Sequence, residues 1–189
     1  MPTFPTLETP RLLLREIVHA DAPDLLAIHG NRELMRWFGT EPLLDLNAAE
    51  ALIDTFASWR TLPNPGTRWA IQLKSDTRLL GTCGLFSWNR AWKKCAIGYE
   101  LATAVQGKGY MREAIEAVLS WGFRQMDLNR IEAQVHPLNL ASLRLLRTFG
   151  FVQEGCLREV GFWGGSFHDM LQFSLLQREY DAVELPARP

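Results

Sequence analysis

The stretch of sequence that decides the fold is Gln106-Gly107-Lys108-Gly109-Tyr110-Met111-Arg112-Glu113. Its two glycines let the backbone approach a ligand closely and take conformations that side chains disfavour. The apolar-periodic segment that follows predicts a helix, whose first N–H groups have no partner inside the helix. Such a loop suits a diphosphate anion. Short glycine-rich turns also precede ordinary helices without any ligand, so the neighbouring segments must distinguish the two interpretations.

Length and charge indicate one globular domain with no affinity for polyanions. The chain has 189 residues, 47% of them hydrophobic and 22% charged, which is enough to bury a sizeable core. We therefore expect a single domain over residues 1–189. Because 20 Lys and Arg face 21 Asp and Glu, the formal net charge is −1 and no general positive field attracts nucleic acid or membranes. We expect neither as a partner.

Cysteine usage and hydropathy favour a cytoplasmic protein without a metal. The three cysteines, Cys83, Cys95 and Cys156, are widely spaced and form no CxxC pair, so they are interpreted as reduced thiols. No uninterrupted apolar stretch approaches the roughly 18 residues that a membrane span needs. We expect a cytoplasmic location and no metal site.

The periodicity of apolar residues predicts an α+β fold with hairpins early in the chain and crossovers later. The predicted strands are 11–15, 69–73, 79–88, 95–101, 130–135, 151–160 and 168–176. The predicted helices start at Asp21, at Asn47, after Gly109 and at Asn139. Asn47 with Glu50 resembles a capping box, and Gly150 is expected to stop the last helix.

Five ordered segments resemble the GNAT superfamily of acetyl-CoA-dependent N-acetyltransferases: residues 97–101, 106–110, 130–133, 139–142 and 149–151. Residues 7–12 and 154–159 are similar to the branch that acetylates the N-termini of ribosomal proteins. The resemblance spans residues 7–180. It implies a mixed, mostly antiparallel sheet of about seven strands, with a central parallel pair splayed apart, and about four helices.

The resemblance also implies acetyl-CoA as the cosubstrate, with its pantetheine arm between the splayed strands. Backbone groups from Tyr99 to Leu101 would bond the arm as an extra strand, and Asn139 would hold an amide of the arm. The residues implied for this site are Tyr99, Leu101, Gln106, Gly107, Lys108, Gly109, Tyr110, Met111, Arg112, Asn139 and Ser142. In the loop, Met111 replaces the small last residue of the family pattern. Lys108 and Arg112 suit phosphates, but such residues at a helix start are also commonly only solvated.

The proton acceptor has several candidates. Glu100, at the end of its predicted strand, is the first choice as general base, although it also fits an exposed strand carboxylate. His136 is an alternative because its reference pKa of about 6.5 suits a base, although a structural hydrogen bond would also explain this histidine. Relatives in the ribosomal branch are expected to have a glutamate near residue 161, where this chain has Gly161. Either Glu159 or Glu100 would then substitute for it, a chain of water molecules would suffice, or the substrate differs.

The proton donor to the departing thiolate is expected to be Ser142, which matches the serine of the family near the sulfur of CoA. A serine there also suits a helix cap. Tyr99 is less suited, because strand alternation points it away from Glu100. A backbone N–H near residues 99–101 is expected to stabilise the oxyanion.

The acceptor is expected to be a primary amine, preferably the N-terminal α-amine of a protein such as a ribosomal protein. An α-amine has a pKa of about 7.7–8.0, so it needs a weaker base than lysine at about 10.4. A small amine (polyamine, amino acid or antibiotic) is the alternative acceptor, and a non-enzymatic acyl-CoA sensor is a further alternative. Aromatic residues in predicted loops or strand ends fit a peptide groove, a homodimer contact or plain core packing. They are Trp37, Phe38, Trp88 and Trp163, with His168 and Asp169 nearby.

Overall fold

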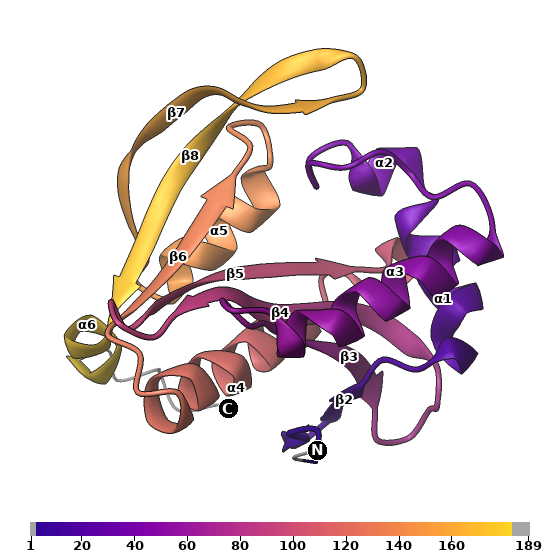
Figure 1. Cartoon of the computed structure of the whole chain (residues 1–189), viewed down its shortest axis with the longest axis horizontal. Helices are drawn as coiled ribbons and strands as arrows, with labels where there is room; N and C mark the ends of the chain where they lie inside the picture. Colours follow the sequence, from indigo (N-terminus) through magenta and orange to yellow (C-terminus); the bar gives the residue numbers. More distant parts are fainter. Residues whose placement is uncertain (1–2, 183–189) are drawn as a thin grey trace.

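The computed structural model describes residues 3–182, so the outermost residues of the expected domain, 1–2 and 183–189, lie outside the described range. Eight strands form one sheet in the order β1-β2-β3-β4-β5-β6-β8-β7 (Figure 1). They are β1 (Leu7–Glu8), β2 (Leu12–Glu16), β3 (Thr67–Leu73), β4 (Leu79–Asn89), β5 (Lys94–Leu101), β6 (Arg130–Val135), β7 (Val152–Trp163) and β8 (Ser166–Leu176). The helices of the described part are α1 (Ala22–His29), α2 (Arg32–Met35), α3 (Leu46–Ser58), α4 (Tyr110–Gln125), α5 (Leu140–Thr148) and α6 (Gln177–Ala182).

Strands β5 and β6 form a parallel pair in an otherwise antiparallel sheet. Their ladder pairs Lys94, Cys95 and Ala96 with Arg130, Ile131 and Glu132, in that order. Beyond it, β5 continues to Leu101 while β6 turns away and pairs with β8 up to Val135. Figure 1 shows β5 crossing the middle of the molecule while β6, β8 and β7 rise away from it. The expected splayed pair is therefore confirmed.

Helices cover both faces of the sheet. Successive residues of a strand point to opposite sides, and apolar residues on both sides need to be buried. On β3, Trp69 and Ile71 belong to the main apolar cluster, together with Ile115 and Leu119 of α4. Between them, Ala70 belongs to a second cluster with residues of α1 and α3. Burying one such leucine or isoleucine side chain contributes about 1.5–3 kcal/mol. The two clusters therefore hold α4 on one face of the sheet and α1 and α3 on the other.

The differences from the expected elements are local. Helix α3 is capped by Asp45, whose Oδ1 accepts a hydrogen bond from Ala48 N at 2.8 Å, so the predicted cap at Asn47 was wrong. A cap needs extended backbone before the helix, which Asp45 has with a φ of −155°. The short elements β1, α2 and α6 were not predicted, because a few residues carry too little periodicity to be recognised.

The last hairpin is longer than expected. Strand β7 runs to Trp163 and β8 begins at Ser166, with Gly164 and Gly165 in the turn between them. Both glycines have positive φ, which a tight turn of this kind requires. No helix in the described part of the chain is long and apolar enough to cross a membrane.

Candidate active site

The loop before α4 exposes unpaired backbone. Gly107 and Gly109 have φ angles of +76° and +78°, in the left-handed region that favours glycine. Within residues 3–182, the N–H groups of residues 109–112 have no hydrogen-bond acceptor, and the first helical bond joins Glu113 N to Gly109 O at 3.1 Å. A Cβ atom at Gly107 would meet nothing within 4 Å. Unpaired N–H groups at a helix start, with open space beside them, fit the diphosphate of acetyl-CoA.

The loop is anchored at its start to the end of β5. The side chain of Gln106 donates from Nε2 to Leu101 O at 2.9 Å. Met111 is buried in the main apolar cluster, which explains why a large residue is tolerated at this position. Lys108 and Arg112 are exposed beside the loop, so their expected phosphate contacts remain predictions.

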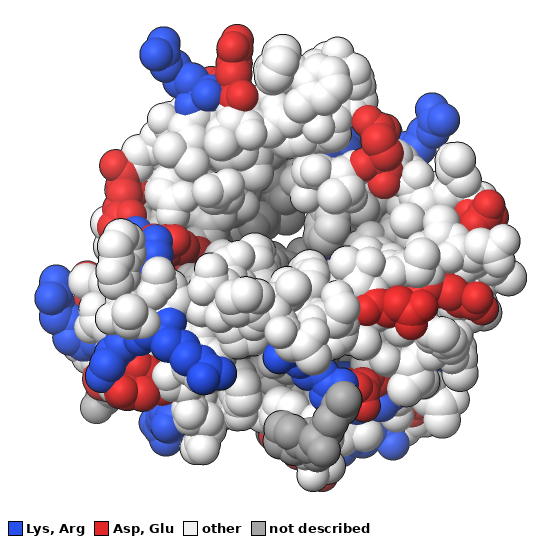
Figure 2. Space-filling model, viewed as in Figure 1, with Lys and Arg blue, Asp and Glu red and all other residues white. Residues whose placement is uncertain are grey.

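The splay between β5 and β6 opens into a hollow at the centre of the molecule. Figure 2 shows this hollow in the same view as Figure 1, over the gap between β5, β6 and α2, and the surface around it is largely uncharged. Because the β5–β6 ladder ends at Ala96, the edge of β5 that faces the hollow has no strand partner within residues 3–182 from Ile97 to Leu101. An extended ligand can therefore pair with this edge, as expected for a pantetheine arm.

Two hydroxyl groups meet across the splay. The Tyr99 hydroxyl of β5 and the Ser142 hydroxyl of α5 lie 2.8 Å apart and share a hydrogen bond. Burial raises the pKa of Tyr99 above its ordinary value although the bond to Ser142 opposes the shift, so the phenol stays protonated. The cap of α5 is Asn139, whose Oδ1 accepts from Ser142 N at 3.2 Å. The Ser142 hydroxyl is thus bonded to Tyr99 and does not serve as the cap.

Glu100 points to the opposite face of β5, into a closed ionic network. Its carboxylate accepts hydrogen bonds from Arg68 and Thr82 and lies 3.1 Å from His29 Nε2. Arg68 also donates to the Thr82 hydroxyl, at 2.6 Å. Burial acts to raise the pKa of Glu100, but Arg68, His29 and Thr82 together lower it below its ordinary value. The carboxylate is therefore ionised and enclosed, rather than exposed and ready to take a proton.

His136 lies at the end of β6 with its tautomer defined by the backbone. Its Nδ1 accepts a hydrogen bond from Leu138 N at 3.1 Å, so the neutral ring carries its proton on Nε2. Burial and the neighbouring His168 lower the pKa of His136, and Asp169 only partly opposes them. Neutral His136 therefore offers a donor at Nε2, whereas the expected role as a base would need the nitrogen that is already bonded.

Aromatic rings around His136 connect the α2 segment to the β7–β8 hairpin. His136 stacks on Trp37 with ring centroids 4.2 Å apart, and Trp163 stacks on His168 at 3.8 Å. Trp163 Nε1 donates to Arg36 O at 3.0 Å, and Gly164 N donates to Glu41 at 2.5 Å. These contacts form one wall beside the splay, lined by rings from three distant parts of the chain.

Gly161 makes room for this wall. A Cβ atom at position 161 would come within 2.3 Å of the Trp163 ring, so no larger residue fits there with Trp163 in this position. The glutamate that the family resemblance leads one to expect near this position is thus incompatible with the ring arrangement of this chain.

The structure separates the expected site residues into two groups. Tyr99, Asn139 and Ser142 gather at the splay, whereas Glu100 faces away from Tyr99 across β5. Sequence reasoning missed the network of His29, Arg68 and Thr82, because 71 residues separate His29 from Glu100 and no local pattern links them. Among the residues that the structure describes, no group of three or more potential ligand side chains could hold a metal ion.

Comparisons with known proteins agree on one family. The family model described as an acetyltransferase (GNAT) domain matches residues 11–152. An uncharacterized N-acetyltransferase of Bacillus subtilis (strain 168) is 36% identical over 174 residues, which cover 92% of this chain and 98% of the relative.

Two further similarities concern proteins with named acceptors. A putative ribosomal N-acetyltransferase of Bacillus subtilis (strain 168) is 30% identical over 56% of this chain and 58% of its own length. The crystal structure of spermidine N-acetyltransferase from Vibrio cholerae, in complex with CoA and spermine, has a TM-score of 0.78 and 26% identity, covering 91% of this chain and 99% of that one.

Proposed function

This chain belongs to the GNAT family and is an acetyl-CoA-dependent N-acetyltransferase, and we propose that its acceptor is the α-amine at the N-terminus of a protein, such as a ribosomal protein. The observation that carries this proposal is the aromatic wall of Trp37, His136, Trp163 and His168 beside the splay. Stacked rings with a neutral donor suit the apolar side chains and amide groups of a peptide.

The carboxylates near the wall bear on both candidate acceptors. Glu100 is already paired with Arg68, so it does not attract an ammonium group. A polyamine carries several ammonium groups, and each of them needs a carboxylate or an aromatic face. Glu41 and Asp169 accept hydrogen bonds from the backbone N–H groups of Gly164 and, at 2.8 Å, of Glu159, and these neutral donors leave their negative charge in place.

An α-amine also fits the hydrogen bonding of the two bases considered first, Glu100 and His136. With a pKa of about 7.7–8.0, it costs only about 1 kcal/mol to deprotonate at pH 7, whereas a lysine amine costs about 4.6 kcal/mol. Because Glu100 is enclosed and the Nδ1 of His136 is bonded, the proposed route for the proton of the amine is through water. A substrate that is partly neutral in solution makes that route sufficient.

The remaining roles follow from the placement of each group. Acetyl-CoA supplies the acetyl group as a thioester, and the N–H groups of residues 109–112 with the free edge of β5 would hold it. Ser142, supported by its hydrogen bond with Tyr99, would donate a proton to the departing sulfur. Because its Nδ1 is bonded to Leu138 N, His136 would donate from Nε2 to a carbonyl oxygen of the acceptor. Backbone N–H groups near residues 99–101 would stabilise the oxyanion.

A polyamine is the second candidate acceptor. It is favoured by the likeness to the spermidine enzyme, which extends over 91% of this chain. One fold hosts several acceptors, so the side chains of the acceptor site, rather than the fold, select between a peptide and a polyamine.

A comparison of turnover with three amines tests the proposal. Thiol release would be measured with a peptide carrying a free α-amine, with the same peptide blocked at its N-terminus but containing lysine, and with spermidine. We expect kcat/KM to be at least about tenfold higher for the free α-amine than for the other two, as for a difference of about 1.4 kcal/mol in transition-state binding. Equal or faster turnover of spermidine would overturn the proposal.

A substitution in the aromatic wall tests whether these rings contact the acceptor. Trp37→Leu removes the ring that stacks on His136 and should raise KM for the peptide while the Kd for CoA stays unchanged. Trp92→Leu is the control, since Trp92 is 72% exposed in the β4–β5 turn. A peptide KM that is the same in both variants would remove the wall from the acceptor site.

A further inference from the structure

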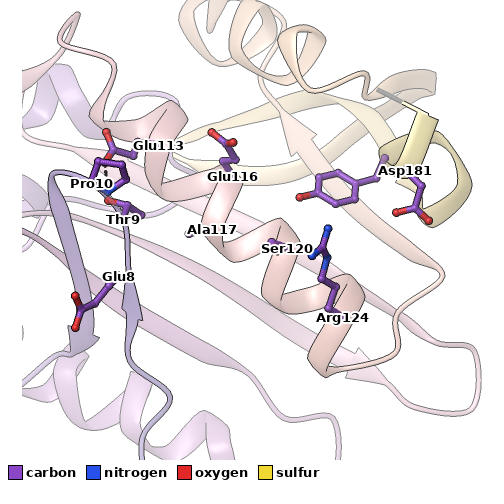
Figure 3. A pocket seen from close by; sticks show the side chains of 10 residues that line it. Glu8, Thr9, Pro10, Glu113, Glu116, Ala117, Ser120, Arg124 and Asp181 are labelled. Carbon is purple, nitrogen blue, oxygen red and sulfur yellow. Dashed lines mark hydrogen bonds between the residues drawn. The ribbon is translucent and has the colours of Figure 1, made fainter. Parts of the chain in front are cut away.

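The N-terminal segment before β2 contacts the glycine loop directly, although about a hundred residues separate the two. Figure 3 shows Thr9 and Pro10 beside Glu113, in the first turn of α4, at one end of a groove of about 480 Å³. Thr9 Oγ1 donates to Glu113 Oε1 at 2.5 Å, and Arg11 N donates to the same oxygen at 2.9 Å. Arg11 Nε donates to Glu113 Oε2 at 2.7 Å. Both carboxylate oxygens are thus bonded by this segment.

These contacts neutralise a carboxylate that lies close to the expected diphosphate. The side chain of Glu113 is only 4% exposed, so without a partner its charge would be poorly screened. Burial acts to raise the pKa of Glu113, but the hydrogen bonds from Thr9 and Arg11 lower it below the ordinary value. The carboxylate is therefore ionised, and the guanidinium of Arg11 compensates its charge at the helix start where an anion binds.

Arg11 also determines the direction of a peptide group in the loop. Its Nη1 donates to Lys108 O at 3.1 Å. In a trans peptide the C=O and the following N–H point to opposite sides, so Gly109 N–H is directed away from Arg11. Gly109 N–H is one of the groups without an acceptor in residues 3–182. By holding the carbonyl on one side, Arg11 keeps this N–H available on the other.

The guanidinium is packed against the loop as well as bonded to it. Arg11 lies over the ring of Tyr110, 4.7 Å from its centroid, and a Cβ atom at Gly109 would be 3.4 Å from Arg11 Nη2. Only an arginine has the planar fork that can bond a carboxylate and a carbonyl while stacking on a ring. A lysine would keep the charge but not these directions.

We propose that Arg11 is a positioning residue of the acetyl-CoA site, which orients the Lys108–Gly109 peptide and neutralises Glu113 so that the loop accepts a diphosphate. This assigns a role to the N-terminal segment, which otherwise has no part in the reaction. The inference rests on acetyl-CoA as the donor and does not depend on which amine is the acceptor.

Direct binding to two ligands tests the proposal without any acceptor. Calorimetry would measure the Kd of CoA, and of pantetheine, which lacks the diphosphate, for the wild type, Arg11→Ala, Arg11→Lys and Arg78→Ala. We expect Arg11→Ala to weaken CoA at least about tenfold and pantetheine less than about twofold, with Arg11→Lys in between. Arg78→Ala, which breaks an exposed ion pair with Asp76, is the matched control and should bind both ligands like the wild type.

A double variant tests the compensation of the Glu113 charge, while the pantetheine affinity of each variant reports whether the fold is intact. Arg11→Ala leaves the charge of Glu113 uncompensated, so adding Glu113→Gln should restore CoA binding by at least about threefold relative to Arg11→Ala alone. Equal weakening of CoA and pantetheine, or unchanged CoA binding in Arg11→Ala, would overturn the proposal. So would a double variant that binds CoA no better than Arg11→Ala. Because no amine is present, none of these outcomes bears on the choice of acceptor.

Discussion

The two faces of β5 carry opposite kinds of chemistry on adjacent residues. On the face toward α5, which we call the open face, Tyr99 shares one hydrogen bond with Ser142, next to backbone of β5 that has no strand partner in the described part of the chain. On the other face, which we call the closed face, Glu100 is hydrogen-bonded to Arg68, Thr82 and His29, so that its charge is enclosed. The difference shows that β5 carries the proposed proton donors on one face and the ion pair that fixes its position on the other. The open face presents neutral hydroxyl groups, whereas on the closed face the ion pair of Glu100 and Arg68 holds the strand in place.

The largest expected effect concerns the closed face. Arg68→Met removes the cation from a pair whose side chains are 3% and 5% exposed, and leaves Glu100 charged without compensation. We expect a loss of about 3–5 kcal/mol in the free energy of unfolding, or roughly 6–20 °C in Tm, measured by thermal and urea denaturation. Arg78→Met, in an exposed pair, is the control and should lose less than about 1 kcal/mol. If Arg68→Met lost no more free energy of unfolding than Arg78→Met, the network around Glu100 would not stabilise β5.

The next effect concerns the open face. Ser142→Ala should lower kcat about 100-fold, or about 2.7 kcal/mol, because a proton donor to the leaving sulfur is lost. The Kd for CoA should change less than about threefold. Tyr99→Phe, which removes only the supporting hydroxyl, should lower kcat by a smaller factor in the same assay. If Tyr99→Phe were the slower enzyme, the tyrosine rather than the serine would be the proton donor.

A smaller effect depends on pH and follows from the lowered pKa of Glu100. The folded-state pKa lies below the unfolded one, so the carboxylate contributes stability above the unfolded pKa, and this contribution is lost as pH falls through the folded pKa. Glu100→Gln should therefore show a flatter decline in stability below about pH 4.5, by at most about 1.4 kcal/mol per pH unit. Urea titrations at several pH values would measure it, and identical slopes in wild type and variant would contradict it.

The same variant tests the original expectation that Glu100 is the general base. Because Glu100 is ionised throughout the neutral range, Glu100→Gln should leave the acid limb of the pH–rate profile in place, even if kcat falls. Disappearance of that limb would identify Glu100 as the base and require its network to open during turnover.

The smallest effect concerns a single local bond of the open face. Gln106→Ala removes the hydrogen bond to Leu101 O and should weaken CoA binding by roughly 2–10-fold, as for about 0.5–1.5 kcal/mol. Gln134→Ala, on the exposed part of β6, serves as the control in the same calorimetric assay. A larger effect than that expected for Arg11→Ala would mean that the loop is held mainly from β5.

The open face was largely predictable because its parts are encoded locally. The glycine loop, the helix after it and the cap at Asn139 each depend on residues within one or two turns of one another. The pairing of Tyr99 with Ser142 was not anticipated, since strand alternation indicates only which side Tyr99 takes.

The sequence by itself determined the family, the donor and the order of elements, because glycine conformations, caps and apolar periodicity act over short distances along the chain. Tertiary structure alone decided three features: that Glu100 is enclosed, that Gly161 lies under Trp163, and that Arg11 holds the glycine loop. Each joins segments that are far apart in sequence, and hydrogen bonds and ring contacts depend on positions within a few tenths of an ångström. Such distances are set only when the sheet and its helices have packed together.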